Sequence, residues 1–150
     1  MRCILFLDHQ GVMYTRKHPS PGILDDFDES AVNALNRILD IVPECEIVIS
    51  SDWKRWVSLE SMQTFYIGQD IKKAPIDYTP IKSGMKTYTD IAKFRADEIC
   101  QWLGNKMINK WVAVDDLDMR PYLTNFVWIT DIKRGLSCNE IEDKIIQALS

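Results

Sequence analysis

The sequence has 150 residues, of which 46% are hydrophobic and 27% charged, and its formal net charge is −4. These totals fit one globular domain with a sizeable core. They argue against a surface built throughout for nucleic acid, although a local basic cleft would not show in the sum. No apolar stretch approaches the roughly 18 residues of a membrane span, and the N-terminal apolar run is too short for a signal peptide, so a cytoplasmic protein is expected.

The cysteines stand singly, beside apolar residues and without a Cys-x-x-Cys pair. This pattern favours buried, reduced thiols in a cytosolic protein over a zinc site or disulfide bonds. The sequence also shows no internal repeat, low-complexity segment or linker, so we expect a single domain over residues 1–150. The cysteines are Cys3, Cys45, Cys100 and Cys138.

The first predicted element is a buried strand at residues 3–7, an apolar run that ends abruptly at an acid. Residues 11–22 contain two prolines and two glycines and predict a hairpin or flap beside this strand. A helix follows, because apolar residues recur at positions 32, 35, 39 and 42 behind possible N-caps at Asp28 and Ser30. Residues 47–49 predict the second strand.

Residues 53–90 are mixed in character and predict one helix around residues 59–66, followed by loops and a weak strand at 74–78. For Trp53 and Trp56 at the start of this stretch, we favour packing in the core over stacking on a base.

The last third of the sequence predicts two helices and two strands. A helix beginning near Phe94 places Ile99, Trp102 and Leu103 on one face. Apolar runs at 111–114 and 126–129 predict the strands. Ser-Cys-Asn-Glu at residues 137–140 forms a capping box ahead of the C-terminal helix.

The apolar runs are continuous rather than alternating, as expected of strands that are covered on both faces in a largely parallel sheet. Strands alternate with helices, so the predicted fold class is α/β, a three-layer, doubly wound, mostly parallel sheet with right-handed crossovers. The strand at residues 3–7 is expected at the centre, between the strands at 47–49 and 111–114.

Each of the four main apolar runs is followed at once by polar side chains. Ligands of open parallel sheets bind at the carboxyl ends of the strands. Any one of these residues could simply cap a helix or start a turn, but two adjacent carboxylates repel each other unless a cation compensates them, and hard oxygen ligands suit Mg²⁺. Together they predict a magnesium site. The residues are Asp8, Ser50, Ser51, Asp115, Asp116, Thr130 and Asp131.

Four segments in order, "ILFLDHQGVM", "EIVISSD", "KFRADEICQWL" with its basic residues, and "WVAVDDLD", resemble the four motifs of the haloacid dehalogenase-like (HAD) phosphohydrolase superfamily. The segments "SSDWK", "IDYTP", "RADEICQWL" and "TDIKRGLS" are similar to small HAD domains that occur alone or in RNA-repair-type proteins. The resemblance covers nearly the whole chain and implies a HAD/Rossmann-like fold without room for a large cap domain.

The resemblance implies that Asp8 is the nucleophile of a phosphatase, which attacks phosphorus to form an aspartyl-phosphate. Mg²⁺ would be bound by Asp8, the backbone carbonyl of Gln10 and Asp115, with Asp116 as a further ligand or as the holder of a bound water. Ser50 would donate a hydrogen bond to a phosphoryl oxygen, and Ser51 is the less favoured occupant of that role.

A cation must also neutralise the charge of the transferring group. Lys93 and Arg95, which precede Asp115 by 22 and 20 residues, are both candidates. The local pattern favours Arg95, while lysine is commoner in the superfamily. A solvated residue at the start of a helix is the ordinary alternative for either one.

Gln10 stands where HAD phosphatases typically carry a second aspartate, which protonates the leaving oxygen and then activates water. Glutamine forms hydrogen bonds but cannot transfer that proton. Three situations follow: the enzyme is slow or acts on substrates whose leaving group needs no proton, the domain has lost turnover and retains phosphate or metal binding, or Gln10 was introduced to trap a complex. His9 is a substitute acid by its ordinary pKa, but strand alternation points it away from Asp8.

An open, capless site is typical of macromolecular substrates, so a phosphorylated nucleic-acid or protein end is the expected partner. A basic and aromatic rim would suit a polynucleotide, although a solvated loop with scattered tyrosines is the more ordinary interpretation. His18 in the segment 11–22 would contact substrate only if that segment folds over the site. The rim candidates are Lys82, Lys86, Lys93, Arg95, Tyr78 and Tyr88.

Overall fold

The computed structural model describes residues 2–15, 24–81, 90–137 and 139–150. These residues form an α/β fold around a five-stranded sheet with the strand order β3-β2-β1-β4-β5. Every neighbouring pair of strands is parallel, and β1 lies at the centre between β2 and β4. The predicted fold class and the predicted central strand are therefore confirmed, and the described residues include no cap domain.

The five strands fall on the five apolar runs of the sequence, with small differences at their ends. The third strand keeps only two of its five predicted residues, because Pro75 has no backbone N–H to donate to a neighbouring strand. The strands are β1 (Cys3–Leu7), β2 (Cys45–Ile49), β3 (Asp77–Tyr78), β4 (Lys110–Asp115) and β5 (Phe126–Trp128).

All four predicted helices are present, together with short 3₁₀ turns. Helix α3 begins earlier than Phe94 because the Asp90 side chain accepts a hydrogen bond from the backbone N–H of Lys93 and so caps the first turn. The helices are α1 (Glu29–Ile41), η1 (Asp52–Arg55), α2 (Leu59–Gly68), α3 (Ile91–Leu103), η3 (Gly135–Ser137) and α4 (Asn139–Leu149).

Of the two predicted caps of α1, Asp28 is the N-cap residue. Asp28 occupies the N-cap position without a capping hydrogen bond, because its carboxylate accepts instead from the backbone N–H and the hydroxyl of Thr15, both at 2.9 Å. Ser30 lies inside the helix. The capping box before α4 depends on residue 138, which is outside the described residues.

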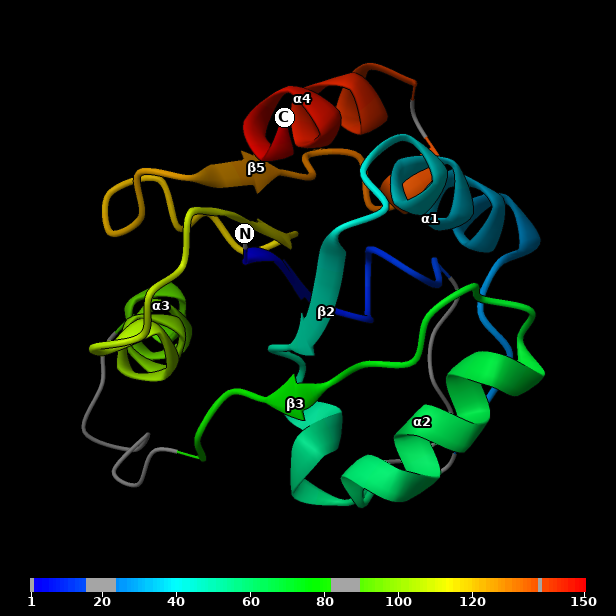
Figure 1. Cartoon of the computed structure of the whole chain (residues 1–150), viewed down its shortest axis with the longest axis horizontal. Helices are drawn as coiled ribbons and strands as arrows, with labels where there is room; N and C mark the ends of the chain where they lie inside the picture. Colours follow the sequence, from blue (N-terminus) through cyan, green and yellow to red (C-terminus); the bar gives the residue numbers. More distant parts are fainter. Residues whose placement is uncertain (1, 16–23, 82–89, 138) are drawn as a thin grey trace.

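Side-chain alternation along the strands divides the core into two layers. Helices α1 and α4 lie next to each other on one face of the sheet, and α3 covers the other (Figure 1). Leu5 and Leu7 of β1 pack in the layer of α1 and α4, whereas Ile4 and Phe6 pack in the layer of α3. Since successive strand residues point to opposite faces, this alternation also fixes where each residue after a strand points.

The segment after β1 begins as a tight buried turn rather than a flap. Gly11 has a φ of +77°, a conformation that only glycine adopts without strain. The carbonyl of His9 accepts hydrogen bonds from the backbone N–H groups of the residues at 12, 13 and 14, and the side chains of Val12, Met13 and Tyr14 are buried. The rest of the predicted flap, including His18, lies outside the described residues.

Two expectations about burial are wrong in part. Trp53 is buried as predicted, but Trp56 is 51% exposed, because it follows the last residue of the short helix η1 and turns outward. Cys3 and Cys45 are buried free thiols, whereas Cys100 is exposed because it lies on the outer side of α3. Among the described residues, no helix has both the length and the apolar character that crossing a bilayer requires.

Candidate active site

Three polar residues occupy equivalent register positions on adjacent strands at the carboxyl edge of the sheet. Leu7 of β1 pairs with Ile49 of β2 and with Val114 of β4. The next residue on each strand is therefore Asp8, Ser50 or Asp115. The backbone hydrogen bonds between the strands continue as far as these residues. The N–H of Asp8 donates to the Val114 carbonyl, and the N–H of Ser50 donates to the Leu7 carbonyl.

Alternation then separates the two neighbours Asp8 and His9. Asp8 continues the side of Ile4 and Phe6, which faces α3. His9 continues the opposite side and packs against the aromatic rings of Phe27, Trp53 and Tyr66. The strand thus delivers a carboxylate to one layer and an imidazole to the other.

The acids form one cluster. Asp8, Asp115 and Asp116 each offer a carboxylate oxygen, and these oxygens lie within 4.8 Å of one another. Asp8 and Asp115 are buried, and Asp116 is half-buried. A side chain at Gly11 would place its Cβ only 2.7 Å from the Asp116 carboxylate, so the glycine is what lets Asp116 approach the turn after β1.

The clustering disfavours negative charge. Burial raises the pKa of Asp8 well above its ordinary value, and the charge of Asp115 adds to this effect, while the charge of Arg95 opposes it. Burial, followed by the hydrogen bond and the charge of Asp115, raises the pKa of Asp116 to about 6. The three carboxylates therefore need a cation if all are to be ionised.

Arg95 supplies positive charge inside the site. Its Nη1 atom lies 3.0 Å from Asp115 Oδ2 and 3.5 Å from Asp8 Oδ2. Burial by itself would lower the pKa of Arg95, but the carboxylates of Asp8 and Asp115 outweigh that effect and raise it. The guanidinium is therefore a fixed cation beside the candidate nucleophile.

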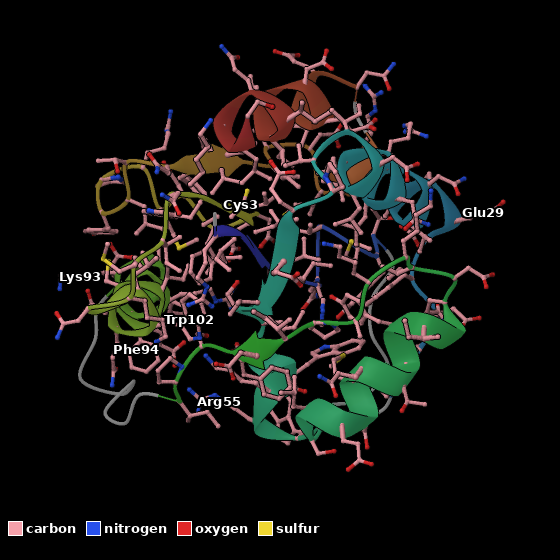
Figure 2. All side chains as sticks on the ribbon, viewed as in Figure 1. Cys3, Glu29, Arg55, Lys93, Phe94 and Trp102 are labelled. Carbon is pink, nitrogen blue, oxygen red and sulfur yellow. The ribbon has the colours of Figure 1, made fainter. Side chains whose placement is uncertain are left out.

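Lys93, the other candidate cation, is not brought to the site. It lies on the outer side of α3, whereas Trp102 lies on the side toward the sheet (Figure 2). Its Nζ atom is 3.4 Å from Asp97 one turn further along the helix, and half of its side chain is exposed. Of the two basic residues that the sequence offered, the structure brings only Arg95 to the acids.

The two serines after β2 are used differently. Ser51 accepts a hydrogen bond from the backbone N–H of Trp53 and caps η1. The Ser50 hydroxyl is buried and has no hydrogen-bond partner among the described residues. A buried hydroxyl without a partner is uncommon and indicates a missing ligand or water, so Ser50 is the better candidate for binding a phosphoryl oxygen.

The two residues after Asp8 differ in their exposure. Gln10 is exposed and forms an isolated β-bridge with Tyr14. His9 is fully buried, its Nε2 atom lies 2.7 Å from the Tyr66 hydroxyl, and burial lowers its pKa to about 3. A neutral, enclosed imidazole on the far layer is not placed to donate a proton to a substrate at Asp8.

Three residues at the site were not predicted from the sequence. Asp52 in η1 lies 3.2 Å from Arg95 Nη2 through its Oδ2 atom. Lys54 and Glu98 form an ion pair at 2.8 Å, with both side chains buried. Lys54 also donates to the Thr79 hydroxyl at 2.8 Å, so it joins η1, α3 and the segment after β3. Arg95 and Glu98 are one turn apart on α3, which fits a shared inner face.

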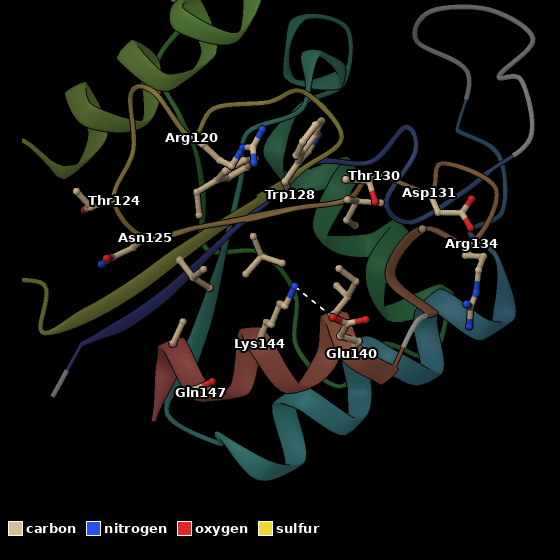
Figure 3. Close-up of a pocket in the computed structure, with 17 residues that line it drawn as sticks. Arg120, Thr124, Asn125, Trp128, Thr130, Asp131, Arg134, Glu140, Lys144 and Gln147 are labelled. Atoms are coloured by element: carbon tan, nitrogen blue, oxygen red, sulfur yellow. Dashed lines mark ion pairs between the residues drawn. The ribbon is translucent and has the colours of Figure 1, made fainter.

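Thr130 and Asp131 do not join the acidic cluster. Asp131 instead accepts a hydrogen bond from the backbone N–H of Lys133 at 3.0 Å. Both residues line a cavity of about 680 Å³ between β5 and α4, with Trp128 and Arg134 (Figure 3). No member of the acidic cluster lines this cavity, so we do not assign the chemistry to it.

The predicted aromatic and basic rim is largely outside the described residues, which exclude Lys82, Lys86 and Tyr88. Tyr78 is described, and its hydroxyl donates to the backbone carbonyl of Val57 at 2.8 Å. This hydrogen bond gives Tyr78 a structural role in joining β3 to the turn after η1.

The residues present suit a divalent cation. Three carboxylates that converge from two adjacent strand ends provide hard oxygen ligands. Burial and the nearby charge of Asp115 raise the pKa values of Asp8 and Asp116, and a bound cation would favour their ionised forms. The buried acidic cluster is therefore consistent with a metal site.

A parallel α/β sheet with an acidic cluster at the carboxyl ends of its central strands is the architecture of a HAD-like domain. The chain matches the family model described as the HAD domain in Swiss Army Knife RNA repair proteins, over residues 4–141. It therefore belongs to this family, as the sequence motifs indicated. No curated protein and no solved structure matches the chain.

In the metal-free protein, Asp116 should lower the stability as the pH rises. Its folded-state pKa of about 6 exceeds the ordinary 3.8, so its contribution to stability is complete below about pH 4 and is lost as the pH rises through 6. Asp116→Asn should remove a pH dependence on the order of 1–2 kcal/mol, allowing for solvent screening. Thermal unfolding from pH 4 to 8 measures this, and an unchanged profile in the variant would contradict it.

Proposed function

We propose that this chain, as a single domain over residues 1–150, is a Mg²⁺-dependent phosphohydrolase that acts through an aspartyl-phosphate at Asp8. The observation that carries the proposal is the level arrangement of Asp8, Ser50 and Asp115 on adjacent strands, with one Arg95 nitrogen contacting both acids. This arrangement supports the proposed roles of Asp8 as nucleophile, Ser50 as hydroxyl donor and Arg95 as cation.

In the proposed reaction, a carboxylate oxygen of Asp8 forms a bond to phosphorus while the bond to the leaving oxygen breaks. Ser50 donates its unused hydroxyl to a phosphoryl oxygen, and Arg95 neutralises the negative charge of the transferring group. Water then hydrolyses the aspartyl-phosphate and regenerates Asp8. Mg²⁺ held by Asp8, Asp115, Asp116 and the backbone carbonyl of Gln10 would supply the charge that keeps the acids ionised and lets a phosphate approach them.

The substrate that we propose is the phosphorylated end of an RNA. The family is that of HAD domains in RNA repair proteins, and the described residues include no cap that would close the site around a small molecule. An open sheet edge admits the end of a long polymer, whereas a small metabolite would gain few contacts there.

The decisive experiment is turnover of p-nitrophenyl phosphate, whose leaving group needs little help from an acid. We expect Mg²⁺-dependent release of nitrophenol by the wild-type protein and loss of at least about 10³-fold in Asp8→Asn, since the amide is not a nucleophile. Asp118→Asn, which alters an exposed acid paired with Arg120, serves as the matched control and should retain activity. Equal rates in wild type and Asp8→Asn would refute the proposed nucleophile.

Binding of Mg²⁺ can be measured without turnover. Mg²⁺ should raise Tm in a concentration-dependent way, because a ligand that binds only the folded state stabilises it. Asp115→Asn keeps the size of the side chain and removes a ligand charge, so the shift should disappear in this variant. A shift of the same size in Asp115→Asn would place the ion elsewhere.

A second candidate function is a catalytically inactive module that binds phosphate or metal. The observation in its favour is Gln10, which cannot exchange a proton with the substrate. Under this alternative the Mg²⁺-dependent rise in Tm persists, and inorganic phosphate binds without any phosphoester being hydrolysed.

A further inference from the structure

Asp52 is a carboxylate at the site that no metal role accounts for. Its Oδ2 atom lies 3.2 Å from Nη2 of Arg95, while Nη1 of the same guanidinium contacts Asp8 and Asp115. One planar group therefore joins Asp52 to the candidate nucleophile. Asp52 is not a member of the acidic cluster, so it would not be a ligand of a cation bound there.

The position of Asp52 combines access to water with a fixed geometry. Its side chain is 44% exposed, in contrast to the buried Asp8. It is the first residue of η1, which Ser51 caps, and it stands two residues after Ser50. Asp52 therefore contacts both solvent and the guanidinium that lies beside Asp8, which would let it meet a hydrolytic water.

We propose that Asp52 is the general base of the second half-reaction, in place of the aspartate that Gln10 replaces. This inference rests on the proposed function. A water oxygen forms a bond to phosphorus, the bond between phosphorus and the Asp8 oxygen breaks, and its electron pair returns to the Asp8 carboxylate. The proton of the water passes to Asp52, which then releases it to solvent.

Cationic side chains lie near both carboxylate oxygens of Asp52. Arg95 contacts its Oδ2 atom at 3.2 Å, and Arg55 Nε lies 3.9 Å from its Oδ1 atom. The charge of Asp52 also acts on the neighbouring Lys54. Because Gln10 cannot donate a proton, the leaving oxygen of the first half-reaction takes its proton from solvent, so alkyl phosphates such as an RNA end are hydrolysed slowly.

The test is the time course of p-nitrophenyl phosphate hydrolysis with Mg²⁺ in wild type, Asp52→Asn and the double variant Asp52→Asn/Gln10→Asp. Asp52→Asn should release about one equivalent of nitrophenol rapidly and then turn over about 10²–10⁴-fold more slowly, because formation of the phosphoenzyme persists while its hydrolysis loses the base. Intact-protein mass spectrometry should detect the trapped phosphoryl group. Adding Gln10→Asp should restore steady turnover, since an aspartate then stands at the usual position.

Other outcomes separate the possible failures. If Asp52→Asn loses the burst and the steady rate together and Gln10→Asp does not restore them, Asp52 only positions Arg95 and the inference is wrong. A steady rate in Asp52→Asn equal to that of wild type also overturns it. If wild type itself shows no Mg²⁺-dependent turnover, the proposed function and the inference fall together. The Mg²⁺-dependent rise in Tm, which Asp52→Asn should retain, verifies that the variant is folded and binds the ion.

Discussion

Gln10→Asp should raise the rate of alkyl phosphate hydrolysis by about 10²–10⁴-fold, the range typical of general acid catalysis. The exposed side chain at position 10 follows Asp8, the proposed nucleophile, by two residues, so we expect an aspartate there to reach a leaving oxygen. Alkyl leaving groups depend on that proton, whereas aryl leaving groups depart without it. The gain should therefore be much smaller for p-nitrophenyl phosphate, and steady-state rates on both substrates measure the difference.

The added carboxylate also has a cost in stability. It would join three acids that already share a small space, so Tm should fall at low Mg²⁺ and recover at saturating Mg²⁺, where the cation offsets the repulsion. Gln10→Glu is the matched control, because it adds the same charge on a longer side chain. No gain on either substrate in a variant that still binds Mg²⁺ would favour the inactive binding module.

Lys54→Met should lower the free energy of unfolding by about 3–5 kcal/mol, the usual cost of removing one partner from a buried ion pair. The Lys54 and Glu98 side chains have exposed fractions of 0% and 1%, so the remaining carboxylate could not be reached by water. Burial lowers the pKa of Lys54, and the hydrogen bond and charge of Glu98 oppose that shift.

The double variant Lys54→Met/Glu98→Leu distinguishes the effect of the buried charges from the effect of side-chain packing. Replacing both charges by apolar groups of similar size should recover most of the lost stability, because no buried charge remains. Urea unfolding of the two variants measures this. Lys93→Met serves as a control, because it removes the more exposed ion pair between Lys93 and Asp97 on α3, the helix that carries Glu98. A double variant as unstable as Lys54→Met alone would show that packing at these positions, rather than charge, is what matters.

The fold was predictable because each strand is a continuous apolar run and each helix has a periodic apolar face. Residues Ile4 to Leu7 are buried on both faces of the sheet, and a strand buried on both faces appears in the sequence as an uninterrupted apolar run. The ends of elements were less predictable, because they depend on single side chains. The early start of α3 follows from the hydrogen bond accepted by Asp90, which apolar periodicity does not reveal.

The acidic cluster was predictable because it follows the ends of strands, where side chains of a parallel sheet converge. The choice between Lys93 and Arg95 also had a signal in the sequence. Arg95 precedes Ile99 by four residues and Trp102 by seven, which places all three on the inner face of α3. Lys93 does not fit that spacing and lies on the outer side.

Asp52 and Lys54 were not predictable, because a short 3₁₀ helix carries no periodic pattern. Their roles depend on Arg95 and Glu98, which are more than 40 residues away in the sequence. The same local geometry explains Trp56, whose exposure depends on where η1 ends. Contacts of this kind come from tertiary structure alone.

The alternation at the end of β1 limits how this sequence can change in evolution. Adding or deleting one residue between Cys3 and Asp8 would turn every later side chain of the strand to the opposite face. The carboxylate would then enter the aromatic pocket that now holds His9, and the imidazole would face Arg95. Substitutions along β1 can be accepted one at a time, but a change in its length inverts the site in a single step. Insertions and deletions in relatives of this chain should therefore spare the stretch from the start of β1 to Asp8.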